Sequence, residues 1–83
     1  MTRSLRILMF HTARDATGAD AIDLPCDEGL GQEELWDRLV ALHPGLGVYR
    51  RIIRLACNGT YVLPDAVFYP GDEVALIPPV SGG

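Results

Sequence analysis

Positions 71–83 read Gly71-Asp72-Glu73-Val74-Ala75-Leu76-Ile77-Pro78-Pro79-Val80-Ser81-Gly82-Gly83, and the rest of the chain is interpreted as a body that presents them. The apolar segment 74–77 follows the turn signal 70–72, a pattern that predicts a final buried strand. Pro78 and Pro79 end this strand, because proline donates no backbone N–H and biases the preceding residue toward extended backbone. Residues 80–83 hold no helix former, so we expect a thin, flexible tail that reaches at most about 13 Å from the domain.

The two glycines of this tail, Gly82 and Gly83, remove side-chain bulk next to the α-carboxylate. Glycine is used where a backbone must approach another group closely. The tail is therefore suited to pass down a narrow channel into the active site of another protein. A free carboxylate is a poor electrophile and a poor nucleophile, so chemistry at Gly83 requires prior activation. The alternative is ordinary fraying of a chain end, in which the two glycines have no function.

The rest of the sequence predicts one sheet with one main helix packed across it, an α+β fold. Strands are expected at 5–10, 21–25, 53–57, 60–62 and 74–77. The Asn58-Gly59 dipeptide is typical of the tight turn that joins two of them. Connections without regular structure are expected at 11–18, 26–31, 46–51 and 63–70. No internal repeat is present.

One segment switches from strand to helix periodicity. Leu35, Leu39 and Leu42 recur at steps of four and three residues, which predicts an amphipathic helix of about three turns over 32–43. Trp36 lies beside this apolar stripe and is the expected core anchor of the helix.

The first strand has apolar residues on both of its faces. Leu5, Ile7 and Met9 share one face, and Arg6, Leu8 and Phe10 share the other. Because the second face lies next to solvent, it suggests a patch that contacts a partner. Arg50, Arg51 and Arg54 form a small basic cluster, which we interpret as a solvated loop and strand edge.

Length and charge narrow the class of protein. Eighty-three residues make one domain with a small core. Eleven acids against seven bases give a formal net charge of −4, which argues against binding to nucleic acid. All seven bases are arginine, so no side chain offers an amine for isopeptide attachment. No secretory or membrane-spanning segment is visible, and the cytoplasm is the expected compartment.

The residues that carry chemistry in other proteins are scattered here. Cys26 and Cys57 are far apart without a C-x-x-C pair, so neither a zinc site nor a redox motif is expected, and a disulfide is the less favoured alternative. His11 and His43 fall in separate loops and are interpreted as solvated. The sequence therefore predicts no metal site and no active site made by this chain alone.

Residues 71–83 resemble the C-terminus of the small, sulfur-carrying subunit of molybdopterin synthase, a family of ubiquitin-like β-grasp proteins. The Gly-Asp-Glu-Val strand followed by Pro-Pro-Val-Ser-Gly-Gly is close to the family's signature. The resemblance extends over nearly the whole chain, through the first strand, the end of the helix and the turn at 56–59. Two departures lie outside the tail: Cys57 replaces an aliphatic residue, and segment 67–70 replaces a more polar one.

The resemblance implies a two-stage mechanism. A ubiquitin-activating-type adenylyltransferase would use ATP and Mg²⁺ to adenylate the Gly83 carboxylate, and sulfur transfer would then give a C-terminal thiocarboxylate. The tail that ends in this thiocarboxylate would insert into the large subunit of a heterotetrameric synthase. There its sulfur would attack cyclic pyranopterin monophosphate and build the dithiolene that binds molybdenum. The chain itself would bind no cofactor.

The resemblance also assigns roles to residues of a β-grasp domain, 1–77, and a tail, 78–83. Gly83 would carry the sulfur. The small residues Gly82 and Ser81 would allow the chain end to move with it into the active site of the partner. Pro78, Pro79 and Val80 would stiffen and aim the tail. Phe10, Tyr61 and Ile77 match positions of the family's apolar, partner-facing patch.

Three other functions remain open at the level of sequence. The chain is alternatively a sulfur carrier for thiazole, tRNA thiolation or cysteine synthesis, a ubiquitin-like protein modifier, or an interaction domain with an inert tail. The Pro-Pro-Val-Ser segment favours molybdopterin over the other carrier pathways. The sequence also leaves open whether the isolated chain self-associates through its apolar patch.

Overall fold

The computed structural model describes residues 3–79. Its strands are β1 (Ser4–Met9), β2 (Ala21–Pro25), β3 (Leu30–Gly31), β4 (Arg54–Cys57), β5 (Thr60–Tyr61), β6 (Val67–Phe68) and β7 (Glu73–Ile77). Its helices are α1 (Thr12–Thr17), α2 (Gln32–Leu42) and the 3-10 helix η1 (Pro44–Tyr49).

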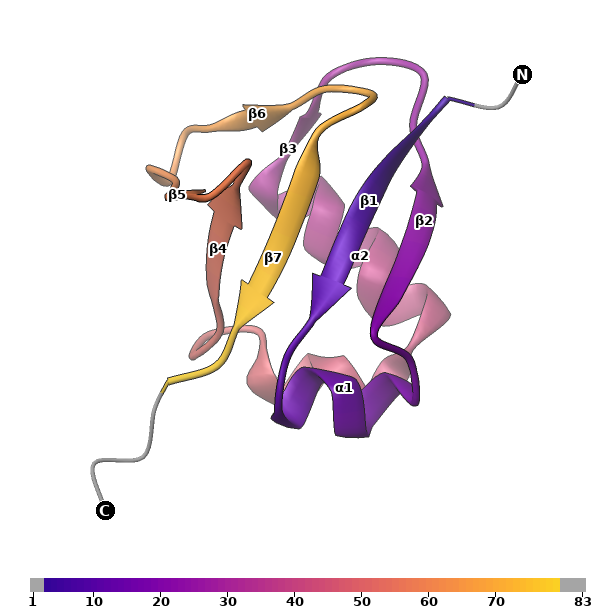
Figure 1. Ribbon diagram of the computed structural model, residues 1–83, viewed down its shortest axis with the longest axis vertical. Coiled ribbons are helices and arrows are strands. Elements are labelled where there is room, and N and C mark those ends of the chain that lie inside the picture. Colours follow the sequence, from indigo (N-terminus) through magenta and orange to yellow (C-terminus); the bar gives the residue numbers. More distant parts are fainter. Residues whose placement is uncertain (1–2, 80–83) are drawn as a thin grey trace.

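Five strands form one mixed sheet in the order β2-β1-β7-β4-β5 (Figure 1). β1 and β7 run parallel, and the other neighbours run antiparallel. The last strand, β7, therefore lies in the middle of the sheet. The short strands β3 and β6 pair separately. The expected ubiquitin-like β-grasp fold, a mixed sheet with one main helix across it, is confirmed.

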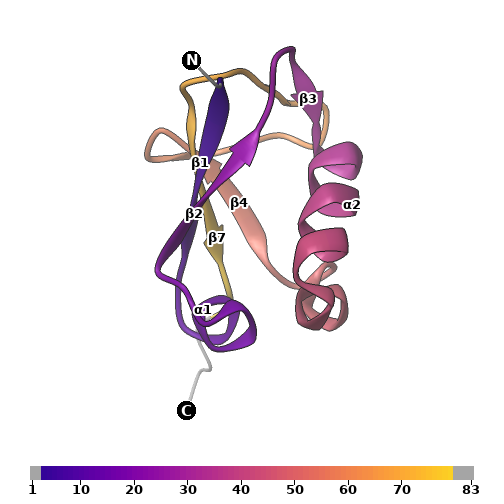
Figure 2. The ribbon, with the colours of Figure 1, turned by 90° about the vertical axis from the view of Figure 1, so that its right-hand side faces the viewer.

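The helix α2 packs on one face of the sheet and leaves the other face uncovered (Figure 2). Leu35, Trp36 and Leu39 are the buried residues of α2, so the expected helix is confirmed to within one residue and Trp36 is a core anchor. The core they enter is built from alternate residues of the strands, including Leu5, Ile7, Met9, Leu55, Val74 and Leu76. Burial of this apolar surface is the main stabilising contribution.

Each of the four expected connections contains regular structure that the sequence analysis missed. Segment 11–18 contains α1, which buries only Ala13 and ends at Gly18 with a left-handed φ of 74°. Segment 26–31 contains the two-residue strand β3, and segment 63–70 contains the two-residue strand β6. The 3-10 helix η1 overlaps segment 46–51. These elements are too short to show a hydrophobic period, which needs a window of about 11 residues.

The turn after β4 and the turn before β7 lie at the same end of this antiparallel pair and are joined by side chains. Asp72 accepts hydrogen bonds from the Tyr69 N–H, at 2.9 Å, and from Asn58 Nδ2, at 3.2 Å. Asn58 Oδ1 in turn accepts the N–H of Glu73 at 3.0 Å. Gly71 has a φ of 94°, a conformation that favours glycine. The Asn-Gly and Gly-Asp-Glu stretches thus fix where β7 begins.

Candidate partner-binding site

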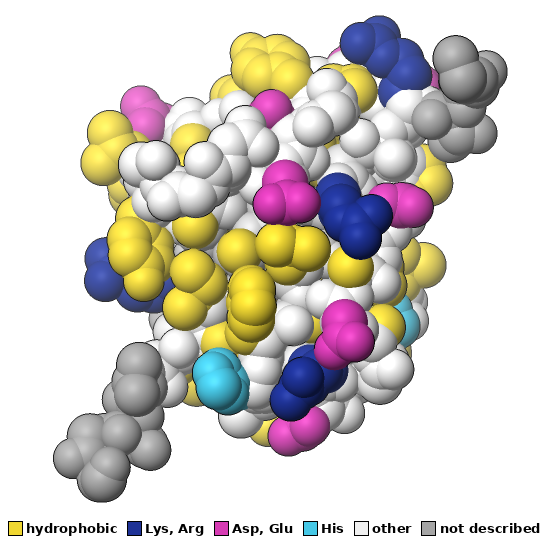
Figure 3. Space-filling model, in the orientation of Figure 1, with side chains coloured by type: hydrophobic (Ala, Val, Ile, Leu, Met, Phe, Trp, Pro, Cys, Tyr) yellow, Lys and Arg dark blue, Asp and Glu magenta, His cyan; other side chains and the backbone are white. Residues whose placement is uncertain are grey.

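The sheet face opposite α2 carries a shallow apolar groove. Figure 3 shows hydrophobic side chains gathered across this face. The groove has a volume of about 360 Å³ and is lined by Leu8, Phe10, Ala56, Gly59, Tyr61, Glu73, Ala75 and Ile77. We call this set the outer-face groove. Its residues come from β1, β4, β5 and β7 and from the short segments beside them.

Small side chains make the floor of the outer-face groove. Ala56 lies opposite Ala75 in the β4–β7 ladder and opposite Tyr61 in the β4–β5 ladder. Leu8 flanks Ala75 from β1. The larger walls stay open to solvent, with Phe10 42% and Tyr61 56% exposed. An apolar depression of this kind, with wide aromatic walls, is typical of a protein interaction site.

The structure brings together the three residues expected to form the partner-facing patch. Phe10 follows β1, Tyr61 ends β5 and Ile77 ends β7, yet all three line the outer-face groove. Leu8 was expected on this face from the sequence, whereas Ala56 and Ala75 were not. The signal for Ala75 was its alternation with buried neighbours along β7.

The root of the tail lies beside the outer-face groove. Pro78 directly follows Ile77 and is buried, whereas Pro79 is exposed. The chain therefore leaves the body of the domain between these two prolines. The other tail residues with expected roles, Val80, Ser81, Gly82 and Gly83, lie outside the described residues.

The basic cluster predicted from the sequence is divided by the structure. Arg50 contacts two carboxylates of α2, at 2.8 Å from Asp37 Oδ1 and 2.9 Å from Glu33 Oε2. The hydrogen bond to Asp37 is the main reason that the pKa of Arg50 is raised. Arg51 lines the same depression as Arg50 and its two carboxylate partners. Arg54 stands apart, on the outer face of the sheet, with its guanidinium carbon 4.9 Å from the centre of the Tyr61 ring.

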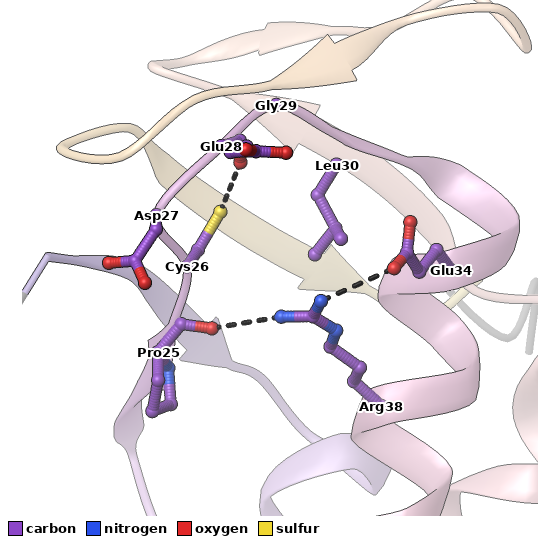
Figure 4. Close-up of a pocket in the computed structure, with 8 residues that line it drawn as sticks. All are labelled: Pro25, Cys26, Asp27, Glu28, Gly29, Leu30, Glu34 and Arg38. Atoms are coloured by element: carbon purple, nitrogen blue, oxygen red, sulfur yellow. Dashed lines mark hydrogen bonds and ion pairs between the residues drawn. The ribbon is translucent and has the colours of Figure 1, made fainter.

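A second depression, of about 390 Å³, lies between α2 and the segment after β2 (Figure 4). Arg38 crosses it and donates hydrogen bonds to the Pro25 carbonyl, at 3.1 Å, and to Glu34, at 3.2 Å. The buried thiol of Cys26 donates to the Glu28 carbonyl at 2.7 Å. These polar groups are already hydrogen-bonded within the protein. We therefore interpret them as structural contacts that hold the segment after β2 against α2.

The remaining titratable groups form no catalytic constellation in residues 3–79. Both cysteines are free thiols, and the pKa of Cys57 is raised by burial and by the nearby Asp72 carboxylate. His11 is exposed before α1, and His43 is half-buried after α2. Within 3–79, no three acidic, histidine or cysteine side chains are placed to hold a metal ion. None of the helices described there is long and apolar enough to cross a membrane.

The sequence model of the ThiS family matches residues 7–83. The chain belongs to this family. Its curated relatives include the molybdopterin synthase sulfur carrier subunits of Arabidopsis thaliana and Homo sapiens, each 35% identical to it. Both alignments cover 95% of this chain, with 82% of the Arabidopsis protein and 93% of the human protein.

Solved structures share the fold. The crystal structure of SAMP1 from Haloferax volcanii is 28% identical, has a TM-score of 0.82, and covers 96% of this chain and 99% of its own. A chain of the complex of subunits 1 and 2 of molybdopterin-converting factor from Helicobacter pylori superposes with a TM-score of 0.68 at 18% identity. That match covers 96% of this chain and 99% of the Helicobacter chain.

Proposed function

We propose that this chain is the sulfur-carrier subunit of molybdopterin synthase. The observation that carries the proposal is the match of the family model over residues 7–83, together with relatives that are molybdopterin synthase sulfur carriers. The structure supports it, since the chain leaves the domain at the rim of an uncovered apolar groove. A partner protein that docks on this groove then has the start of segment 80–83 at a fixed position on its own surface.

The chemistry takes place at the Gly83 carboxylate. A ubiquitin-activating-type adenylyltransferase binds ATP and Mg²⁺, and a carboxylate oxygen of Gly83 attacks the α-phosphorus and releases pyrophosphate. Adenylation turns a poor leaving oxygen into AMP, a good leaving group. A sulfur nucleophile at the oxidation level of sulfide then attacks the carbonyl carbon. AMP departs, and the product is a C-terminal thiocarboxylate.

The second stage occurs on the large subunit of the synthase. The outer-face groove docks on that subunit, and the tail enters its active site as a narrow chain without side chains at Gly82 and Gly83. The sulfur of the Gly83 thiocarboxylate bonds to carbon of cyclic pyranopterin monophosphate, and water then cleaves the acyl C–S bond. The sulfur stays on the pterin, and the carrier returns to its carboxylate form. The body of this chain contributes positioning, which is worth several orders of magnitude in rate when two reactants are held in line.

Deletion of Gly83 tests the proposal. The purified carrier is mixed with the activating enzyme, ATP, Mg²⁺, a sulfur source and the large subunit, and molybdopterin formation is measured. Mass spectrometry of the intact chain follows the exchange of oxygen for sulfur. We expect the deleted protein to fold as the wild type does and to give neither thiocarboxylate nor molybdopterin. Molybdopterin formation by the deleted protein would refute the sulfur-carrier function.

A second candidate function is favoured by the likeness to SAMP1, since other structural neighbours bear the name small archaeal modifier protein 1. In that function, a lysine amine of a target protein attacks the same activated Gly83 carbonyl and forms an isopeptide bond. Incubation of tagged carrier with cell lysate and ATP distinguishes the two. Adducts at target lysines that disappear on deletion of Gly83 would establish the modifier function.

A further inference from the structure

Two charged side chains mark the ends of β7 on this face, Glu73 in the lining of the outer-face groove and Arg54 just outside it, and they differ in whether another charge balances them. At the start of β7, Glu73 Oε2 lies 4.0 Å from Arg6 Nε. At the end of β7, Arg54 lies opposite Ile77 in the β4–β7 ladder. None of the ion pairs among residues 3–79 includes Arg54. On this face, β7 therefore has a balanced acidic end and an unbalanced basic end.

The unbalanced cation is held in place by an aromatic ring. The guanidinium carbon of Arg54 stands 4.9 Å from the centre of the Tyr61 ring, within the range of a cation–π contact. Both side chains are exposed, and Tyr61 is a wall of the groove. A partner that covers this wall must also cover the guanidinium.

Covering that group places a demand on the partner. Removal of a charge from water without a counter-charge is strongly unfavourable. The guanidinium presents its N–H donors as a planar fork, and a carboxylate matches this fork with two parallel hydrogen bonds. Most of the chain would repel an acidic partner surface, because the formal net charge is −4. Arg54 is thus a local point of attraction for an acid.

We propose that Arg54, held against Tyr61, recognises a carboxylate of the molybdopterin synthase large subunit at the rim of the outer-face groove. The inference rests on the proposed function, which supplies this subunit as the occupant. A structural neighbour with the same fold was solved as a complex of subunits 1 and 2. The partner surface contains an aspartate or glutamate next to the apolar side chain that fills the groove between Phe10 and Ile77.

This contact gives the docked complex a direction. Glu73 and Ile77 are four residues apart on one strand, or about 13 Å. Glu73 already faces Arg6. A partner carboxylate beside the apolar side chain that fills the groove therefore increases the affinity only when it lies at the Ile77 end, next to Arg54. The tail begins one residue later, so the direction of docking decides where the tail points. Arg54 is a positioning residue, because it lies outside the tail and touches no reacting atom.

The test is calorimetric titration of the large subunit with the full-length carrier and three variants. Arg54→Glu reverses the charge, and Arg54→Gln removes it while keeping most of the side-chain length. Arg51→Glu is the matched control, because it makes the same change of charge beside α2, away from the groove. Circular dichroism verifies that all four proteins are folded.

We expect Arg54→Glu to bind about ten- to a hundredfold more weakly than wild type, and Arg54→Gln by a smaller factor. Arg51→Glu is expected to stay within about twofold. A scan that changes each interface carboxylate of the large subunit to arginine should identify one position that restores binding of Arg54→Glu. The amount of thiocarboxylate that each variant forms with the adenylyltransferase is also measured. It shows whether the same substitution impairs the reaction with this second partner.

The outcomes separate this inference from the proposed function. If wild type binds and Arg54→Glu binds equally well, or loses no more affinity than Arg51→Glu, the recognition of a carboxylate by Arg54 is refuted while the sulfur-carrier function stands. If only activation is impaired, the carboxylate belongs to the adenylyltransferase and the proposal is wrong as stated. If wild type itself does not bind the large subunit, the proposed function fails and this inference fails with it.

Discussion

Asp72 belongs to the most informative stretch of the sequence, yet its contacts are those of a structural residue. One carboxylate oxygen accepts the N–H of Tyr69 and the other accepts the side-chain amide of Asn58. The resemblance to a family therefore rests in part on residues that build the turn before β7. A signature can identify a function without each of its members taking part in the chemistry.

Replacement of Asp72 by alanine should lower the free energy of unfolding by about 1–2 kcal/mol, because it removes two hydrogen bonds and leaves the Tyr69 N–H without its partner. Urea denaturation followed by circular dichroism measures the change. Asp65→Ala is the matched control, since Asp65 is exposed and takes part in none of the side-chain hydrogen bonds or ion pairs found within 3–79. The control should stay within about 0.5 kcal/mol of wild type. Equal midpoints for the two variants would contradict this role of Asp72.

Cys57 should react slowly with thiol reagents at neutral pH. Its pKa is raised, first by burial and then by the nearby negative charge of Asp72, so less of it is the reactive thiolate. The rate of alkylation by iodoacetamide, read from the Cys57 peptide by mass spectrometry, should rise with pH and reach half of its maximum above the ordinary thiol pKa. A half-maximum below that value would contradict the expected direction.

The same shift makes stability depend on pH in one direction. The folded state holds the Cys57 proton more tightly than the unfolded state, so this contribution to the free energy of unfolding is fully present below the unfolded pKa. It is lost as the pH rises through the folded pKa. Alkaline conditions are therefore expected to lower stability, and a Cys57→Ala variant should lose this part of the pH dependence.

Among the single elements, β7 contributes one face to the core and the other face to the outer-face groove. Val74 and Leu76 are fully buried, whereas Ala75 and Ile77 line the outer-face groove. Both sets follow from the period of two along a strand. The strand thus couples the stability of the domain to the shape of the outer-face groove.

Replacement of Ile77 by aspartate should weaken binding to the large subunit by about 2–4 kcal/mol, because it places an unpaired charge in the covered part of the groove. Leu63→Asp is the control, since Leu63 is 72% exposed and lies outside the groove. Calorimetry measures both, after circular dichroism has shown that the variants fold. If Ile77→Asp binds as tightly as Leu63→Asp, the interface lies elsewhere.

The sequence predicted the long elements because each has a clear local signal. The spacing of Leu35 and Leu39 places α2 to within one residue. Alternation places β2, and short apolar runs place β1 and β7. It missed α1, because six residues with Ala13 as the only buried member give no stripe. It missed β3 and β6, because two residues cannot alternate.

The candidate site was predicted only in part, for a reason of topology. Tyr61 and Ile77 came from the family resemblance, and Phe10 came from it and from the apolar second face of the first strand. Only the structure shows that the three line one groove. The floor depends on the register that sets Ala56 opposite Ala75. Register between strands far apart in sequence cannot be read from either strand alone. The stacking of Arg54 on Tyr61 depends on the same register, and the sequence analysis grouped Arg54 with the wrong neighbours.

At the scale of the whole molecule, the body and the tail are expected to have separable tasks. Replacement of Gly82 by valine should leave folding and docking intact, because the outer-face groove lies on the body. Adenylation should fall sharply, since a β-branched residue removes backbone conformations that only glycine reaches easily and misplaces the carboxylate. Mass spectrometry of the intact protein measures adenylate and thiocarboxylate over time.

The control for this substitution is Gly47→Ala. Gly47 lies in η1, where an added Cβ would meet only Val40 Cγ1 at an ordinary 3.6 Å. This variant should be adenylated at the wild-type rate. Wild-type rates for Gly82→Val as well would show that no narrow channel constrains the tail, and the two glycines would need another explanation.

The central place of β7 also has a mechanical consequence. A force applied to the tail acts along a strand that is hydrogen-bonded to β1 on one side and to β4 on the other. Both ladders are loaded in shear, so their bonds must break together, whereas a strand peeled from an edge loses them one at a time. A translocating protease that grips residues beyond Pro79 therefore meets its highest barrier at the first step. The end of the chain that carries the proposed chemistry is therefore the end that two ladders hold against a pulling force.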